Sequence, residues 1–136
     1  MQGHSNIQGL SLIELMVALA IIGIISAVGL PFYQNYIAAA NAGVMDYNIQ
    51  TINLLQDGRR VDEGEFVQGS YNPADPDAAT GLKNVLGWSP GTDTGDYSYL
   101  IVCTTLSAAP PECTRASGYT ITATHLASGD TIVRTF

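Results

Sequence analysis

The chain has 136 residues, a length that fits one domain with an appended segment. Its 5 basic and 12 acidic side chains give a net charge of −7, which argues against the basic surface of nucleic-acid binders, so no nucleic-acid partner is expected. Hydrophobic residues make up 46% of the chain, which excludes an intrinsically disordered protein. Two cysteines are too few for a disulfide-rich scaffold or a four-cysteine zinc site.

An apolar segment near the amino terminus is long enough to cross a membrane. Residues 15–32 read LMVALAIIGIISAVGLPF and contain no charged side chain. Glu14 directly precedes them, and a carboxylate inside a membrane span costs about 2.5–3.5 kcal/mol, which signals a partner. The chain has no Lys or Arg between residues 1 and 58, so a newly cut amino terminus would be the nearest source of positive charge.

Two simpler interpretations of this segment fit less well. A secretory signal needs a positive start and a small-residue cleavage site just after the apolar run. Residues 1–9 have no Lys or Arg, and the small-residue pattern at 40–42 lies well beyond the run. A plain membrane anchor explains the length of the apolar segment but leaves Glu14 without a role.

Helical spacing continues beyond the apolar segment. Steps of three and four residues connect Tyr33, Ile37, Ala40, Val44, Tyr47, Thr51 and Leu54. We therefore expect one helix from Ser11 to Asp57, about 70 Å long at 1.5 Å per residue, with Gly58 ending it. Pro31 removes a backbone donor inside this helix and is expected to kink it.

The rest of the sequence predicts a connecting region followed by strands. Residues 59–96 are rich in Gly, Pro and Asp, with a short helical piece expected around 78–86. Strands are expected at 97–103, 119–124 and 131–136, the last two joined by a turn at Ser128-Gly129-Asp130. The predicted fold class is α+β: a long kinked amino-terminal helix, half transmembrane and half amphipathic, packed on a small antiparallel sheet.

Residues 9–37 carry a family resemblance. The sequence GLSLIE at 9–14, followed by the apolar run and by Pro31, resembles the class III signal of type IV pilins and pseudopilins. The resemblance implies that a prepilin peptidase and methyltransferase cuts after Gly9 and methylates the amine of Leu10. It also implies that Glu14 pairs with the amino terminus of a neighbouring subunit, and that Gly23 and Pro31 bracket a part of the helix that loosens in filaments.

The resemblance divides the chain into five parts. These are a cleaved leader at 1–9, a transmembrane and assembly half of the helix at 10–32, an amphipathic half at 33–58, a connecting αβ-loop region at 59–96, and an antiparallel β-sheet with a disulfide-closed loop at 97–136. The expected localisation is the bacterial inner membrane for the precursor and an extracellular filament for the processed chain.

The function that the resemblance implies is that of a structural subunit of a type IV pilus, which supports adhesion, twitching motility or DNA uptake. The expected partners are other pilin subunits, the peptidase, the inner-membrane assembly platform and the membrane. The modest length and the text GYTITAT resemble small, minor pilins. The alternatives are a DNA-uptake pilin or a type II secretion pseudopilin in the periplasm.

Cys103 and Cys113 are expected to form a disulfide, because the domain would face an oxidising compartment and many pilins carry such a bond near the carboxy end. Two unpaired buried thiols are the alternative. Asp75, Asp77, Asp93 and Asp96 could offer oxygen ligands to calcium, but their spacing fits no EF-type loop, so solvated turns are favoured and no metal or cofactor is expected.

No catalytic constellation stands out in the sequence. The text GWSPG at 87–91 matches a nucleophile elbow, but Pro90 lacks the backbone N–H that such an elbow uses, so a turn is predicted. His125 follows a predicted strand and is interpreted as a surface turn residue. The sequence therefore favours a structural protein over an enzyme.

Overall fold

Helix α1 (Leu12–Glu63) is the longest element of the computed structural model, which describes residues 11–91, 96–104, 112–113 and 118–136. The chain divides into two compact units, Met1–Ala39 and Ala40–Phe136, and α1 contributes residues to both. The expected leader at 1–9, with Gly9 and Leu10 at its cleavage site, lies outside the described residues. Within the first unit, α1 continues through Pro31 without interruption.

The carboxyl end of α1 differs from the prediction. The helix does not stop at Gly58 but runs to Glu63, where an ion pair of 2.6 Å joins Arg59 to Glu63 one turn apart. Gly64 has a φ of 80°, and its N–H donates to the carbonyl of Arg60 at 3.0 Å. The left-handed glycine that ends the helix is therefore the next one along the chain.

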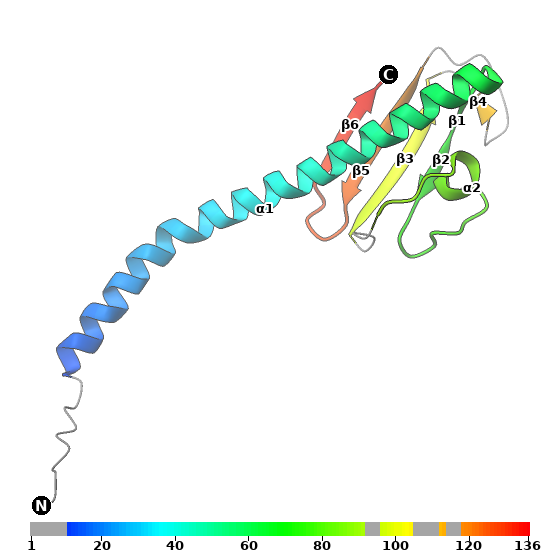
Figure 1. Ribbon diagram of the computed structural model, residues 1–136. Helices are drawn as coiled ribbons and strands as arrows, with labels where there is room; N and C mark the ends of the chain where they lie inside the picture. The colour runs from blue at the N-terminus through cyan, green and yellow to red at the C-terminus, as the bar shows by residue number, and fades with distance from the viewer. Residues whose placement is uncertain (1–10, 92–95, 105–111, 114–117) are drawn as a thin grey trace, which may run out of the picture. The chain divides into compact units, whose positions relative to one another are not determined.

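A four-stranded antiparallel sheet forms the other layer of the second unit (Figure 1). Its strands, in spatial order, are β2 (Gly69–Tyr71), β3 (Tyr97–Cys103), β5 (Tyr119–His125) and β6 (Thr131–Thr135). The sequence predicts β3 with its observed bounds, and β5 and β6 to within one residue. It misses β2, which lies in the stretch predicted as a connection and pairs Tyr71 with Tyr99.

Two further pieces of structure lie in the part predicted as irregular. Strand β1 (Phe66–Val67) pairs with β4 (Glu112–Cys113) in a small second sheet. Helix α2 (Leu82–Leu86) is shorter than the expected piece at 78–86. Gly87 caps it in the left-handed conformation, and Trp88 then enters the hydrophobic core with 3% exposure.

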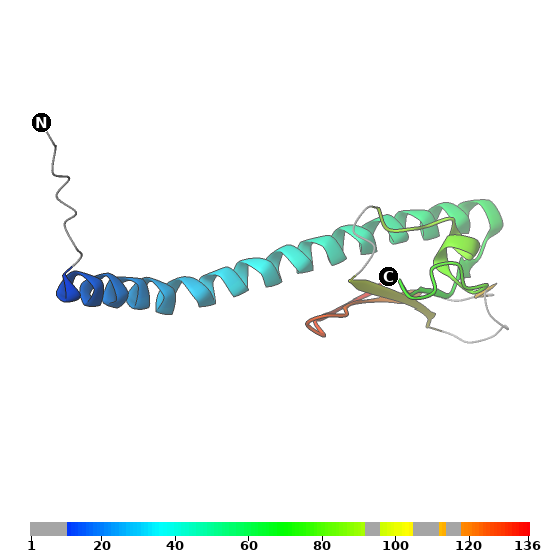
Figure 2. The same ribbon diagram turned by 90° about the horizontal axis from the view of Figure 1, so that it is seen from below.

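The core of the second unit lies between the carboxy-terminal part of α1 and one face of the sheet (Figure 2). The stripe of α1 that is buried there consists of Met45, Asn48, Ile49, Ile52 and Gln56. The predicted stripe is wrong in this part of the helix, since Tyr47 and Leu54 are 71% and 70% exposed. Two of the buried positions are polar, so a pattern of apolar residues alone selects a neighbouring face.

Alternation along the strands separates the two faces of the sheet. Every second residue of β3 and β5 is buried: Tyr97, Tyr99, Ile101, Cys103, Tyr119, Ile121, Ala123 and His125. The intervening residues of β5 are threonines at intermediate exposure. A long helix packed on an antiparallel sheet confirms the predicted α+β class.

Candidate assembly surface on helix α1

The amino-terminal part of α1 presents an apolar surface that the chain itself does not cover. The twelve large hydrophobic side chains from Leu12 to Leu30 are between 52% and 77% exposed. Full burial of one such side chain is worth about 1.5–3 kcal/mol. A surface of this extent requires lipid or apolar partners to cover it.

Length and hydropathy make α1 a candidate membrane span. Its most apolar stretch of 18 residues has a mean hydropathy of 2.5, and none of it is buried inside the chain. Among the described residues it is the one helix that is long and apolar enough to cross a membrane. Gly23 lies within this surface, and a side chain added there would meet no atom within 4 Å.

Glu14 lies at the start of this surface, in the first turn of α1. Its Oε2 accepts a hydrogen bond of 2.8 Å from the backbone N–H of Ser11, and the N–H of Glu14 donates to the carbonyl of Ser11 at 3.0 Å. The side-chain bond is one half of a capping box, which satisfies a donor that the helix start leaves open. The carboxylate also complements the positive end of the helix dipole.

Comparison with known proteins shows which motif and which family the amino-terminal part of the chain resembles. Residues 4–30 match the family model of the prokaryotic N-terminal methylation motif. The type IV major fimbrial protein FimA of Dichelobacter nodosus is 32% identical over 119 residues, which cover 69% of this chain and 74% of FimA. The chain belongs to the type IV pilin family.

Other relatives of this pilin are matched over less of their length. Another FimA sequence of Dichelobacter nodosus is 44% identical over 63 residues, or 41% of this chain and 38% of that protein. A fimbrial protein of Moraxella nonliquefaciens is 34% identical over 93 residues, or 55% and 60% of the two chains. The pilin thus spans less than two thirds of these two relatives. No solved structure matches it.

The names of these relatives describe fimbrial proteins, which are structural subunits and not enzymes, so the pilin is not an enzyme. The text GWSPG, excluded above as a nucleophile elbow, forms the end of α2 and the entry of Trp88 into the core. Instead of the predicted turn, the structure has the left-handed end of α2 at Gly87, after which Trp88 is buried inside the domain.

Three asparagines on α1 hydrogen bond to three tyrosines on the sheet of the pilin's second unit. The hydroxyl of Tyr97 donates to Asn41 Oδ1 at 3.1 Å, and Asn48 Nδ2 donates to the hydroxyl of Tyr99 at 2.7 Å. A third bond runs from the hydroxyl of Tyr119 to Asn53 Oδ1. These bonds fix how the helix lies along the strands, because each satisfies polar groups at or near the core.

Sequence reasoning missed these six residues. Burial raises the pKa of the Tyr99 hydroxyl, and burial together with the charge of Asp57 raises that of Tyr119. The available signal was the presence of Asn48 and Asn53 in the same part of the helix as Met45, Ile49 and Ile52. Polar residues on a helix face that packs against a sheet need partners across the interface.

Gln56 is fully buried and binds a strand by its main chain. Its Nε2 donates to the carbonyl of Val67 at 2.5 Å, and the N–H of Val67 donates to Gln56 Oε1 at 3.1 Å. The amide therefore takes the place of a neighbouring strand for one residue of β1. This contact secures the small sheet against α1.

A disulfide joins Cys103 at the end of β3 to Cys113 in β4, as the oxidising compartment and the family resemblance predict. Because Cys113 pairs with Phe66 in β1, the bond connects the large sheet to the small one. The ring of Phe66 in turn packs edge-on against Tyr119, with ring centroids 4.7 Å apart. The disulfide thus belongs to the same packed region as the buried tyrosines.

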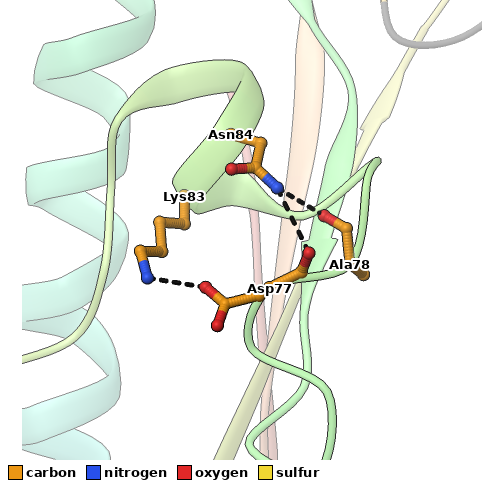
Figure 3. Close-up of polar contacts among 4 residues, drawn as sticks. All are labelled: Asp77, Ala78, Lys83 and Asn84. Atoms are coloured by element: carbon orange, nitrogen blue, oxygen red, sulfur yellow. Dashed lines mark hydrogen bonds and ion pairs between the residues drawn. The ribbon is translucent and has the colours of Figure 1, made fainter.

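Of the candidate calcium ligands, the structure describes Asp75, Asp77 and Asp96. Asp77 forms an ion pair of 2.6 Å with Lys83, and Asn84 Nδ2 donates to the carbonyls of Asp77 and Ala78 (Figure 3). The described residues contain no group of three His, Cys, Asp or Glu side chains that could hold a metal. Asp93 lies outside the described residues. These contacts attach the segment before α2 to that helix.

The prediction that His125 is a surface turn residue is wrong. It is the last residue of β5, is 9% exposed, and lies against the ring of Tyr97 with centroids 5.0 Å apart. Its Nδ1 lies 2.6 Å from Ser128 Oγ, which donates to Asp130 Oδ2 at 2.6 Å. The alternation along β5 explains why His125 is buried. Its contact with Ser128 then connects the end of β5 to the turn that leads to β6.

Proposed function

We propose that this chain is a structural subunit of a type IV pilus, inserted first in the bacterial inner membrane and then packed into an extracellular helical filament. The single observation that carries the proposal is the uncovered apolar surface of α1 from Leu12 to Leu30, which starts at one carboxylate and overlaps the matched methylation motif. Lipid covers such a surface in the precursor, and the helices of other subunits cover it in the filament.

Processing supplies the charge that Glu14 needs. A prepilin peptidase cuts after Gly9, and the methylated amine of Leu10 becomes the cation that the carboxylate of a neighbouring subunit meets. A carboxylate has lone pairs for several donors, so the bond from Ser11 leaves capacity for an amine. A subunit added out of register would bury an unpaired charge, so the pair acts on register more than on net stability.

Gly23 and Pro31 serve the same packing. Gly23 adds no side chain to the surface, which permits close approach of another helix. Pro31 removes one backbone donor, which weakens the helix where it would loosen on assembly. The inner-membrane assembly platform would lift each subunit out of the bilayer.

The relatives' names support a pilus over a secretion pseudopilus, since several are called type IV major fimbrial proteins. They leave adhesion, twitching motility and DNA uptake as alternative outputs of the same filament. Those outputs depend on what the filament touches and on the proteins that extend and retract it.

Mass spectrometry of sheared filaments tests the processing step. The expected mature chain starts at N-methylated Leu10. A filament subunit that starts at Met1 would contradict the proposal.

Replacement of Glu14 tests the assembly step. We expect Glu14→Ala to lower the amount of subunit in sheared filaments at least about tenfold. The variant lacks the carboxylate that would pair with the amine of Leu10 in a neighbouring subunit and so fix the register between the two helices. Membrane insertion and the fluorescence of Trp88 should not change. Glu63→Ala is the matched control, since it removes an exposed carboxylate from the same helix outside the apolar surface. Equal assembly of both variants would count against the role of Glu14.

A further inference from the structure

The second unit contains a groove beside α1 that the proposed function does not yet use. It has a volume of about 420 Å³. Its lining residues are Ala40, Gly43, Val44, Tyr47 and Asn48 from α1, and Pro90 and Gly91 from the segment after α2. This volume lies within the range of about 300–1,000 Å³ that is typical of binding pockets.

Gly43 has no explanation inside the chain. A glycine within a helix is less stable than alanine, because it loses more backbone freedom on folding. A side chain added at Gly43 would meet no atom within 4 Å, and the residue has an ordinary helical conformation. Neither close packing within the chain nor a special backbone angle therefore requires glycine here. Its effect is to keep the groove open.

The described residues that line the groove carry no charge, although the chain has a net charge of −7. Asp46 is the one charged residue between Glu14 and Asp57. Its Oδ1 forms an ion pair of 3.2 Å with Arg134 of β6, and its Oδ2 accepts a bond of 2.9 Å from Gln50. The carboxylate of Asp46 is thus paired with the sheet.

Electrostatics decides which occupant fits. Two copies of an acidic chain repel each other over most of their surfaces, so close contact is least costly where the surface is uncharged. The groove offers such a surface, with an exposed aromatic ring at Tyr47 that can pack against an apolar group. A cationic ligand, in contrast, would find no carboxylate among the lining residues that the structure describes.

We propose that this groove receives an apolar side chain from a second copy of the chain in the filament. The inference rests on the proposed pilus function, because only a polymer brings many copies together. Gly43 then keeps open the space into which the neighbour's side chain inserts. The groove adds a contact between the folded domains to the packing of the apolar helices.

Two glycines of α1 allow a matched test in the full-length protein. Gly43 and Gly58 are both exposed, both lie inside the helix, and both have open space where a side chain would go. Substitution of either by leucine should raise the melting temperature by about 2–6 °C, because helix propensity improves. Only Gly43→Leu fills the groove.

We expect Gly43→Leu to reduce the amount of sheared filament at least tenfold, Gly43→Ala to reduce it less, and Gly58→Leu to leave it unchanged. A photo-crosslinking amino acid at position 43 should give covalent dimers of the chain in filaments, and the same group at 58 should not. Normal assembly of Gly43→Leu, or crosslinks from position 43 to a different protein, would overturn the inference.

The two proposals fail in distinguishable ways. If the unaltered chain is absent from filaments, the proposed function itself is wrong. If the unaltered chain is present and Gly43→Leu enters filaments equally well without a crosslink at 43, only the groove inference is wrong.

Discussion

The two parts of α1 show how differently one helix can be stabilised. From Leu12 to Leu30 it is almost entirely apolar, yet every large side chain there is more than half exposed. From Ala40 onward it is far more polar, yet it buries Met45, Ile49 and Ile52 together with two polar residues. The more hydrophobic part is thus the part that the folded chain leaves uncovered.

Hydrophobicity alone therefore does not say where a helix packs. The carboxy-terminal part pairs its polar residues with specific partners, such as Asn48 with Tyr99 and Gln56 with Val67. Such pairs offset the cost of burial and fix one arrangement. The amino-terminal part carries few polar groups, so lipid and other helices can replace each other around it.

Matched isoleucine substitutions give the largest expected contrast between the two parts. Ile52 is 0% exposed and Ile22 is 59% exposed. We expect Ile52→Ala to lower the free energy of unfolding of the second unit by about 2–5 kcal/mol, because it leaves a cavity in the core. Ile22→Ala should change that free energy by less than about 0.5 kcal/mol.

Trp88 is the only tryptophan and is buried in the core, so its fluorescence during denaturant unfolding of the detergent-solubilised chain reports on the second unit. The contrast would be lost if both variants unfolded at the same denaturant concentration. That result would mean that the amino-terminal part of α1 also stabilises the folded domain.

The sequence predicted the features that rest on local chemistry. Helix α1 starts one residue after the expected Ser11, and the segment 97–103, which is rich in β-forming residues, gives the bounds of β3. The same logic placed a glycine stop after α1 but chose Gly58 instead of Gly64. Both glycines follow polar residues, and nothing local tells which one takes the left-handed conformation.

Features that rest on distant contacts were missed. Strand β2 is three residues long, and it exists because Gly69 to Tyr71 pair with β3 some thirty residues later. The buried face of α1 was misassigned because polar residues such as Asn48 and Gln56 are expected to be exposed. Only the contacts with their distant partners on the strands explain why they are buried. The candidate assembly residues lie on α1, as predicted: Glu14, Gly23 and Pro31. Their roles in assembly remain predictions.

Removal of the disulfide should affect the second unit alone. The substitutions Cys103→Ala and Cys113→Ala together should lower its free energy of unfolding by about 3 kcal/mol, since the bond closes a loop with a sequence separation of 10. Hydrogen exchange should show the loss first at Phe66 and Val67, whose strand pairs with Cys113 and Glu112. A loss of protection at Phe66 and Val67 that is no earlier and no larger than the loss across β3 and β5 would contradict this local role.

Alkaline pH provides a smaller and reversible test of the helix–sheet bonds. Burial raises the pKa of Tyr99 and Tyr119 above the ordinary value of 10.0. Above pH 10 the unfolded tyrosines lose their protons while the folded ones keep theirs, so stability falls as pH rises, by up to about 1.4 kcal/mol per pH unit for each group. Far-UV circular dichroism melts from pH 8 to 12 should show this fall.

Tyr119→Phe should make the same curve less steep above pH 10, because it removes one of the two titrating groups. It should also cost about 1 kcal/mol at pH 8, where the bond to Asn53 is lost. Tyr47→Phe is the control, since the side chain of Tyr47 on α1 is 71% exposed. An unchanged slope in Tyr119→Phe would show that its hydroxyl does not titrate with unfolding.

The smallest expected effects distinguish the observed end of α1 from the predicted one. Gly58 lies inside the helix with open space around it, so Gly58→Ala should stabilise the second unit by about 0.5–1 kcal/mol. Gly64 has a φ of 80°, so Gly64→Ala should destabilise it by about 1 kcal/mol. Thermal melts of the two variants should therefore shift in opposite directions. The reverse pair of shifts would place the helix end at Gly58 and would remove the Arg59–Glu63 ion pair from the helix.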